Sequence, residues 1–310
     1  MGSKSLATLI KLKARNRNGY EYPILPKTLT KNLITLGSYQ MKKILFIFSL
    51  IFIILSELIN AEPTKGDTLP AAIIGDAGPL TGKELNYFIQ DEKTSGYLAM
   101  PSTTGSHPAV ILIHEWNGLV SRVKETADSF AEEGYIALAV DLYSGRVGSN
   151  REENMSLVQE TFAHPKTIIA NLNAAAEFLR NHKDSNGKVA AIGWCYGGGV
   201  ALSFALGGDH HDATAIFYGR LLTNPEQLAH VDHEFYGTFV ENDNGIPVQD
   251  VHDFTKALRS AGINNDIHIY DEVSHGFWLH VDRNPGINTG PAIDAWQRLK
   301  MFLQRNLYEL

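Results

Sequence analysis

The sequence predicts an α/β fold over residues 80–310, with a mostly parallel, doubly wound sheet flanked by helices in a single domain. Residues 110–113 and 136–140 are uninterrupted apolar runs, which are typical of parallel strands buried on both faces. Helical segments are expected between and after such strands, at residues 121–133, 150–164, 166–180, 249–260 and 292–306. Strands that alternate with helices indicate a doubly wound sheet.

Shorter segments complete the predicted sheet. Further strands are expected at residues 188–192, 235–240 and 267–270. Residues 85–90 and 95–100 are separated by only four residues, so we expect them to form a leading antiparallel pair, preceded by a lead-in over residues 62–79. Pro165 is expected to separate two helices, because proline cannot continue a helix that precedes it. With 44% hydrophobic residues, the chain can bury one substantial core.

The only cysteine of the chain, Cys195, lies at the centre of a Gly-Trp-Cys-Tyr-Gly turn, residues 193–197. An expected strand precedes this turn and an expected helix at 198–206 follows it, which is the context of a nucleophile elbow. Free amide groups and the helix dipole at a helix N-terminus favour negative charge, so we expect the thiol to ionise easily. The alternative is a buried, inert cysteine, which the flanking glycines disfavour.

A nucleophile needs a base and an acid, and in chains with an elbow these follow in the order acid, then histidine. Asp243 lies in the polar loop after strand 235–240, and Glu241 is the local alternative. His275 lies in a loop just beyond strand 267–270, whereas His268 falls inside that strand. Because parallel sheets carry their chemistry at the carboxyl ends of the strands, we expect Asp243 and His275 to meet Cys195.

Six short motifs together resemble the dienelactone hydrolase (carboxymethylenebutenolidase) family of the α/β-hydrolase superfamily. They are Ile-His-Glu-Trp-Asn-Gly at 113–118, Val-Asp-Leu-Tyr at 140–143, Gly-Trp-Cys-Tyr-Gly-Gly at 193–198, Phe-Tyr-Gly-Arg at 217–220, residues 243–247, and Ser-His-Gly-Phe at 274–277. The resemblance runs from about residue 80 to the C-terminus. It implies the α/β-hydrolase fold and cleavage of an ester or lactone, without a metal or organic cofactor.

The resemblance also implies roles for individual residues. Cys195, Asp243 and His275 would form the catalytic triad, and the backbone amides of Tyr196 and Trp116 the oxyanion hole. Glu115 would receive the proton of the resting thiol. Forming the thiolate only when substrate arrives would protect it from oxidation.

The chain departs from the family in its arginines. The family holds a substrate carboxylate with two arginines, one after the Asp-Leu-Tyr motif and one four residues after the catalytic histidine. Arg146 stands near the first position, one residue late, but Leu279 stands at the second. Arg283 and His280 lie nearby, and their spacing assigns neither of them this role. We therefore expect Arg146→Ala to raise KM chiefly for carboxylate-bearing substrates, and the missing arginine weakens the case for dienelactone itself.

The remaining candidates are aromatic residues and histidines. Tyr143 and Trp278 are candidates for lining the substrate pocket, although aromatic residues beside strands more often belong to the core. The histidine and aspartate groups at 209–212 and 230–233 contain potential metal ligands but lack a third cluster at a recognisable spacing. We expect both segments to be solvated, and no metal site is predicted.

The N-terminal segment has the features of an export signal. Met41-Lys42-Lys43 precedes an apolar run, residues 44–55, and cleavage after Ala61 would leave 249 residues. We expect residues 41–61 to be a signal peptide for a periplasmic or secreted protein. The alternative is an uncleaved anchor through residues 44–60. Residues 1–40 are a basic extension, which suggests that translation starts at Met41 rather than Met1.

Charge divides the chain at the same place. Residues 1–43 carry a net charge of +8, so the net −7 of the whole chain leaves −15 on the remainder. An acidic domain argues against nucleic acid and against a membrane surface as partners. We expect a monomer that acts on a small ester or lactone. The alternatives are a general carboxylesterase or thioesterase, and a catalytically idle protein that binds a ligand in the same cleft.

Overall fold

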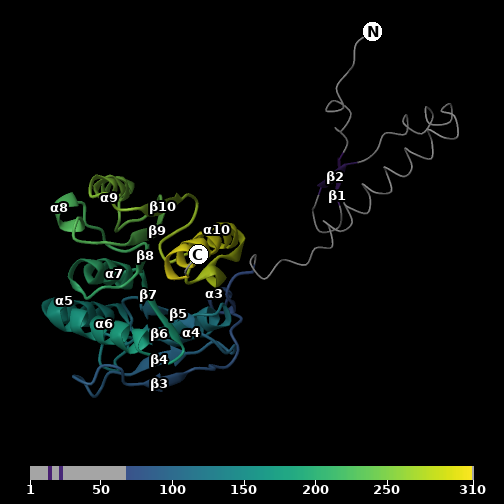
Figure 1. The fold of residues 1–310 in the computed structure, drawn as a ribbon. Helices are drawn as coiled ribbons and strands as arrows, with labels where there is room; N and C mark the ends of the chain where they lie inside the picture. Colours follow the sequence, from purple (N-terminus) through teal and green to yellow (C-terminus); the bar gives the residue numbers. More distant parts are fainter. Residues whose placement is uncertain (1–12, 16–20, 24–67, 309–310) are drawn as a thin grey trace, which may run out of the picture. The chain divides into compact units, whose positions relative to one another are not determined.

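Eight strands form the sheet of the main unit in the computed structural model, which describes residues 13–15, 21–23 and 68–308 (Figure 1). Their order across the sheet is β10-β9-β8-β7-β5-β6-β4-β3. In chain order the strands are β3 (Lys83–Leu85), β4 (Gly96–Ala99), β5 (His107–Ile113), β6 (Ile136–Val140), β7 (Ser185–Trp194), β8 (Ala213–Phe217), β9 (Glu234–Val240) and β10 (Asn265–Tyr270). The strands from β5 to β10 pair in parallel, and β3 and β4 are antiparallel. The predicted doubly wound α/β domain is confirmed.

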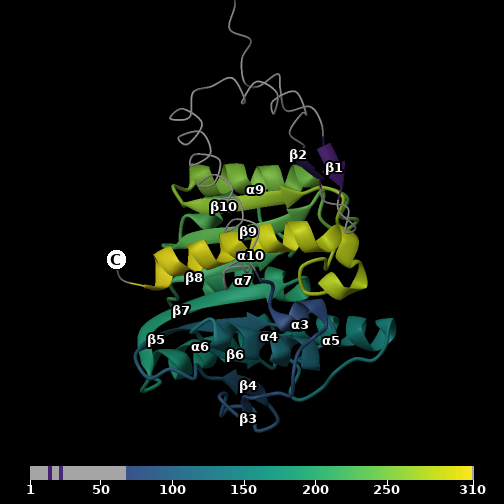
Figure 2. The same ribbon diagram turned by 90° about the vertical axis from the view of Figure 1, so that its right-hand side faces the viewer.

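Helices cover both faces of this sheet. They are α3 (Ala71–Ile74), α4 (Ser121–Glu132), α5 (Arg151–Ala163), α6 (Pro165–Arg180), α7 (Tyr196–Gly207), α8 (Pro225–Leu228), α9 (Val248–Ser260) and α10 (Pro285–Leu307), with a 3₁₀ turn, η2 (Val281–Arg283). α3, α4 and α10 lie on one face, and α5 to α9 lie on the other (Figure 1). Figure 2 shows α10 lying across the middle of the sheet.

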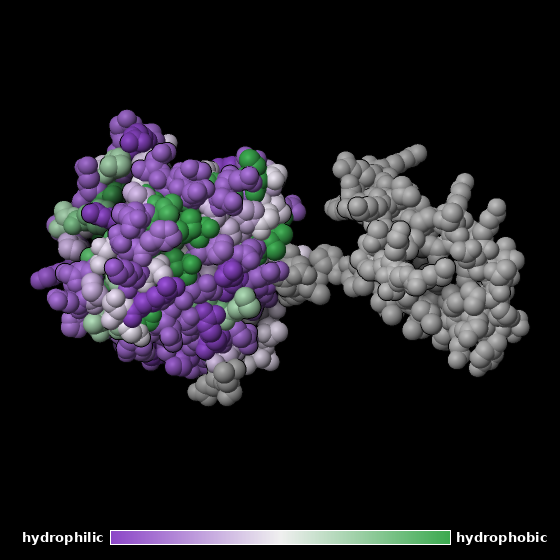
Figure 3. Space-filling view, turned by 90° about the horizontal axis from the view of Figure 1, so that it is seen from above, coloured by the Kyte–Doolittle hydropathy of each residue, from purple (hydrophilic) through white to green (hydrophobic). Residues whose placement is uncertain are grey.

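The core is divided by the sheet into an apolar layer on each face. Side chains of β5 alternate between these layers, with Val110 and Leu112 in one and Ile111 and Ile113 in the other. Four consecutive apolar residues can all be buried only because both faces of the strand are covered. The exposed surface is different in character: seen from above, hydrophilic residues cover most of the visible face and hydrophobic ones gather in patches between them (Figure 3).

Three details differ from the sequence prediction. The leading strands do pair in antiparallel fashion. However, the first of them, β3, ends at Leu85, whereas a strand over residues 85–90 was expected. The helix expected at 292 begins at Pro285 and continues through Pro291, although an interior proline removes one helical hydrogen bond. Strand β8 was not predicted, because its sequence Ala-Thr-Ala-Ile-Phe is short and follows a polar segment.

The two histidine segments are also less solvated than predicted. His211 is 1% exposed and stacks on Phe204, with ring centroids 4.4 Å apart. Thr214 Oγ1 lies 2.8 Å from His211 Nε2 and 2.8 Å from His233 Nε2, so one hydroxyl joins the two imidazoles. Burial lowers the pKa of His211 to about 3 and that of His233 to about 4. The prediction of a solvated segment is therefore wrong for His211.

The N-terminal residues form a separate unit, residues 1–64. Within it, β1 (Lys13–Arg15) pairs antiparallel with β2 (Glu21–Pro23). The predicted signal segment, residues 41–61, lies outside the described residues. Within the described part of the chain, no helix is both long enough and apolar enough to cross a membrane.

Candidate active site

Cys195 lies in a strained turn between strand β7 and helix α7. Its backbone has φ 54° and ψ −115°, a conformation that residues other than glycine rarely adopt. The glycines around it leave no space for side chains: a Cβ at Gly193 would lie 2.0 Å from the carbonyl oxygen of Gly197, and a Cβ at Gly197 would lie 2.3 Å from that of Ile113. The half-buried thiol is thus held at the first turn of α7, in the geometry of a nucleophile elbow.

Neighbouring strands bring the predicted acid and base to the same edge of the sheet. Asp243 follows β9 and His275 follows β10, and these strands pair side by side. His275 Nδ1 donates to Asp243 Oδ2 over 2.7 Å. The other carboxylate oxygen of Asp243 accepts from the amides of Gly245, at 2.8 Å, and Ile246, at 3.2 Å. These contacts fix the carboxylate, whose side chain is 4% exposed, whereas the alternative acid Glu241 is exposed.

The electrostatics of this pair follow from its contacts. Burial alone would lower the pKa of His275, but hydrogen bonds with Asp243 and Cys195 outweigh it and raise that pKa to about 10. Burial likewise opposes the charged form of Asp243, and its hydrogen bonds to His275 and to backbone amides outweigh burial and lower its pKa. An imidazolium between a carboxylate and a thiol is therefore favoured.

Tyr218 packs against the imidazole of His275, although it was not predicted as a site residue. It follows β8 with φ 40°, is fully buried, and its ring lies 4.9 Å from that of His275. Its hydroxyl accepts from the amide of Leu279. A positive φ at a buried aromatic residue is a local strain that the fold maintains at this site. The Phe-Tyr-Gly-Arg motif is the sequence signal for this position.

The two amides expected to form the oxyanion hole lie on adjacent segments. The Tyr196 amide is the first of α7, where an N–H has no acceptor within the helix. Trp116 lies in the turn after β5, and the hydroxyl of Tyr143 donates to its carbonyl oxygen over 3.1 Å. Tyr143 itself is fully buried. The hydroxyl of Tyr143 thus supports the turn at Trp116 from inside the protein. Tyr143 was expected to line the substrate pocket, and it does not.

Glu115, next to Trp116, is held by a histidine from a distant part of the chain. His280 Nε2 lies 2.8 Å from Glu115 Oε2, and the two side chains are 13% and 12% exposed. The Glu115 carbonyl is held as well: the Leu142 amide donates to His114 Nε2, so His114 Nδ1 carries a proton and donates to that carbonyl over 2.6 Å. Both the carboxylate and the backbone of Glu115 are therefore fixed.

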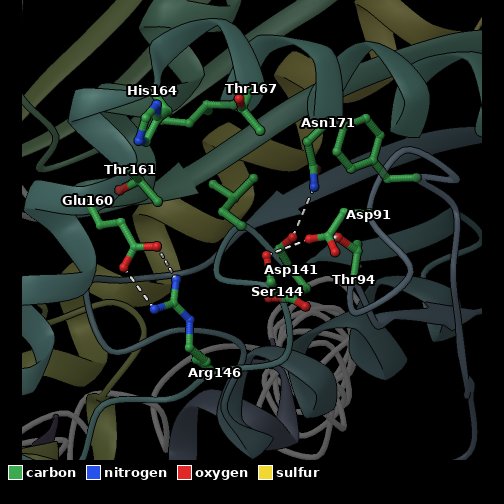
Figure 4. A pocket seen from close by; sticks show the side chains of 13 residues that line it. Asp91, Thr94, Asp141, Ser144, Arg146, Glu160, Thr161, His164, Thr167 and Asn171 are labelled. Atoms are coloured by element: carbon green, nitrogen blue, oxygen red, sulfur yellow. Dashed lines mark hydrogen bonds and ion pairs between the residues drawn. The ribbon is translucent and has the colours of Figure 1, made fainter.

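Arg146 lies in a different cavity, of about 140 Å³, and is paired there (Figure 4). Its guanidinium makes two parallel contacts with Glu160, at 2.8 and 2.7 Å, and its Nε donates to the Tyr143 carbonyl. Cys195 and His275 do not line this cavity. The structure thus places Arg146 in a bidentate ion pair outside the cleft that holds the thiol.

Trp278 lies in the core. It is fully buried and stacks on Trp194, with ring centroids 5.8 Å apart and ring planes 14° from parallel. The apolar layer between the sheet and α10 includes both tryptophans. Of the three expected substrate-binding residues, Arg146, Tyr143 and Trp278, none lines the cleft at Cys195.

That cleft has a volume of about 610 Å³ and is mostly apolar. Cys195, His275, Trp116 and Tyr196 line one part of it. The rest of its lining includes Met155, Val158 and Phe162 of α5, Leu202 and Leu206 of α7, and Arg220, Leu221 and Leu222 after β8. The helical spacing of 155, 158 and 162 is a signal that sequence analysis could have used. Within the described ranges, no group of three or more His, Cys, Asp or Glu side chains is placed to hold a metal ion.

Comparison with known proteins gives consistent matches. The family model described as "Dienelactone hydrolase family" matches residues 94–307. Protein usf of Aquifex pyrophilus is 31% identical over 221 residues, which cover 69% of this chain and 94% of that protein. A Methylorubrum extorquens protein named "Putative carboxymethylenebutenolidase" is 28% identical over 252 residues, covering 77% of this chain and 85% of that protein.

A solved structure shares the fold. The crystal structure of a "Putative Dienelactone Hydrolase" from Klebsiella pneumoniae has a TM-score of 0.63 and 23% sequence identity. The match covers 73% of this chain and 98% of that one. At this identity the likeness shows the arrangement of strands and helices, and the residues of the site have to be judged on their own geometry.

Proposed function

The chain belongs to the dienelactone hydrolase family and is a hydrolase of ester or lactone bonds, and we propose that Cys195 is its nucleophile. The observation that carries the proposal is the contact of 2.7 Å between His275 and Asp243, in the loops that follow β10 and β9, at the same edge of the sheet as the end of β7. A nucleophile at an elbow, a histidine and a buried acid in this order along the chain are the parts that acyl transfer requires.

The proposed reaction has two halves. The Cys195 thiolate attacks the carbonyl carbon, and the amides of Tyr196 and Trp116 hold the oxyanion that forms. When the bond to the leaving oxygen breaks, His275 gives its proton to that oxygen, leaving a thioacyl group on Cys195. His275 then takes a proton from water as the water attacks the thioester, and the acid and thiolate are released. Asp243 keeps the imidazole in the tautomer that can do this.

Glu115 is proposed to take up the proton of the resting thiol. Its position next to Trp116 at the end of β5 supports this role. Its Oε2 is hydrogen-bonded to His280, and the other carboxylate oxygen is the one that would take the proton from Cys195. His280 therefore becomes a positioning residue for Glu115 in the proposed mechanism.

Labelling and substrate assays test the proposal. We expect His275→Ala to slow both the hydrolysis of an aryl ester and the labelling of Cys195 by iodoacetamide. Cys195→Ala should abolish hydrolysis of aryl esters. Labelling at the rate of a free thiol, together with unchanged activity in His275→Ala, would favour the idle ligand-binding protein. Comparing aryl esters, acyl thioesters and dienelactones on the wild type and Cys195→Ala separates a dienelactone hydrolase from a general carboxylesterase or thioesterase.

We also propose that residues 41–61 direct export of the chain. The basic start, the apolar run and the small residue at Ala61 support this proposal. N-terminal sequencing of the native protein should then begin at Glu62. Recovery of a chain that retains residues 41–61 would favour the anchor instead.

A further inference from the structure

The cleft at Cys195 continues well past the triad, along helix α7. Its lining includes Gly199, Leu202, Ser203 and Leu206, which recur on one side of that helix, and Cys195 directly precedes the first residue of the helix. With a rise of 1.5 Å per residue, the path from Cys195 to Leu206 is about 16 Å long. The cleft, with a volume of about 610 Å³, therefore extends well beyond the space that a reacting carbonyl group needs.

One wall of the cleft is an apolar stripe on helix α5. Met155, Val158 and Phe162 recur at helical spacing and line the cleft, while the adjacent face of α5 buries Asn154 and Leu157 in the protein. Met155 is 38% exposed and Phe162 is 50% exposed. Large apolar side chains exposed together at the mouth of a catalytic cleft are typical of a surface that a ligand covers.

We propose that this cleft binds the acyl group of the substrate, and that the preferred substrates are esters of elongated apolar acids. This inference rests on the proposed function, because it takes Cys195 as the point of attachment. In that reaction the acyl group stays on Cys195 through both halves, while the alcohol leaves after the first. The group that needs a lasting place along α7 is therefore the acyl group.

Burial of the chain sets the expected selectivity. Each methylene of the acyl chain that is removed from water lowers the free energy of the bound state. The expected gain is about fourfold in kcat/KM per methylene, as long as the cleft has room for the chain. Leu221 and Leu222 after β8 and Ile246 complete the apolar lining of the cleft. The gain should end when the chain passes Leu206 and reaches solvent.

The test is a series of aryl esters with acetyl, butanoyl, octanoyl and dodecanoyl groups, assayed on the full chain. We expect kcat/KM to rise by at least a hundredfold from acetyl to octanoyl, and Phe162→Ser and Leu206→Ser to reduce that ratio at least tenfold. Met301→Ser is the matched control, because Met301 is 60% exposed on α10 and does not line the cleft. It should leave the ratio unchanged.

The outcomes separate the inference from the proposed function. A ratio near one in the wild type, or a ratio that Phe162→Ser and Leu206→Ser leave intact, would overturn the acyl site while Cys195 remains the nucleophile. A second series with one acyl group and alcohols of increasing length should show little dependence. Dependence on the alcohol alone would also overturn it. Hydrolysis of the acetyl ester by Cys195→Ala at the wild-type rate would instead reject the proposed function.

Discussion

Glu115 and His280 are 165 positions apart in the chain, yet Oε2 of the first lies 2.8 Å from Nε2 of the second. Both side chains are largely buried, at 12% and 13% exposure. A carboxylate in such a place needs a donor, because removing it from water without a hydrogen bond is costly. His280 is the donor here, and it lies on the loop that also carries His275.

Replacing His280 should show whether this hydrogen bond positions Glu115. His280→Gln keeps an N–H donor, so we expect kcat/KM for an aryl ester within about threefold of the wild type. His280→Leu removes the donor and should lower kcat/KM about tenfold. Steady-state kinetics from pH 5 to 9 measure both. Arg283→Leu is the control, since Arg283 is exposed on the adjacent 3₁₀ turn. Equal losses in the two His280 variants would contradict a positioning role.

Asp243→Asn should disable the base without disturbing the fold. An amide in place of the carboxylate no longer fixes the imidazole tautomer, so we expect kcat/KM to fall about a thousandfold or more. Because the hydrogen bond to Asp243 raises the pKa of His275 against the effect of burial, its removal should move the alkaline limb of the pH profile to lower pH. Kinetics between pH 6 and 10 test this. The matched variant Glu241→Gln should behave as wild type, and a similar loss there would point to Glu241 as the acid.

Gly197→Ala tests the crowding of the elbow. The new Cβ would lie 2.3 Å from the Ile113 carbonyl oxygen and 2.5 Å from that of His114, and backbone atoms of a central strand cannot move aside easily. We expect a loss of about 3 kcal/mol in the free energy of unfolding, measured by urea denaturation. Gly207→Ala, at the other end of α7, would have no atom within 4 Å of its Cβ. It should change stability by less than about 1 kcal/mol, and a similar cost at both positions would refute the argument.

Local sequence signals were sufficient for the fold and for the expectation that Asp243 and His275 meet. The apolar runs of β5 and β6 predict central strands, and glycines on both sides of Cys195 predict the tight turn. The contact between Asp243 and His275 could be anticipated because parallel strands place their carboxyl ends at one edge. That reasoning needs only the order of the elements along the chain.

The lining of the cleft could not be obtained in the same way. Arg146 and Trp278 were selected by their closeness in sequence to site motifs, but a bidentate contact with Glu160 and stacking on Trp194 depend on where distant segments pack. Leu206 and Phe162 lie on different helices and come to line one cleft only in the folded chain. The contact between Glu115 and His280 likewise could not be predicted from the spacing of the residues in the sequence.

The buried histidine pair should make the protein sensitive to acid. The pKa of His211 in the folded state, about 3, lies below its unfolded value of about 6.5, so the unfolded chain binds protons first as pH falls. The contribution to stability is complete above pH 6.5 and is lost progressively as pH falls toward 3. Between pH 7 and pH 5 this linkage amounts to about 2 kcal/mol for His211.

His211→Phe isolates this effect. A phenyl ring can still stack on Phe204 and cannot be protonated, so the loss of stability between pH 7 and pH 5 should be about 2 kcal/mol smaller than in the wild type. Urea denaturation at the two pH values measures the difference. His252→Phe, at an exposed position on α9, should leave the pH dependence unchanged. An unchanged dependence in His211→Phe would show that other groups determine acid stability.

Arg220 is the residue from which we expect recognition of a negatively charged substrate. Apart from His275, it is the only Lys, Arg, His, Asp or Glu among the described residues that line the cleft at Cys195. Its position is fixed by close packing of Gly219 against Gly198, which leaves no room for a Cβ at either glycine. The expectation first attached to Arg146 therefore moves to Arg220, because the guanidinium of Arg146 is already bound to Glu160.

A matched pair of substrates measures this effect. The aryl half-ester of adipic acid and the aryl ester of hexanoic acid have acyl chains of equal length and differ in one carboxylate. Since Arg220 is exposed and its charge is screened by solvent, we expect Arg220→Gln to raise KM about fivefold for the half-ester and hardly at all for the neutral ester. Added salt should reduce the difference in the wild type. Arg146→Gln should leave both KM values unchanged, and a selective rise there would return the role to Arg146.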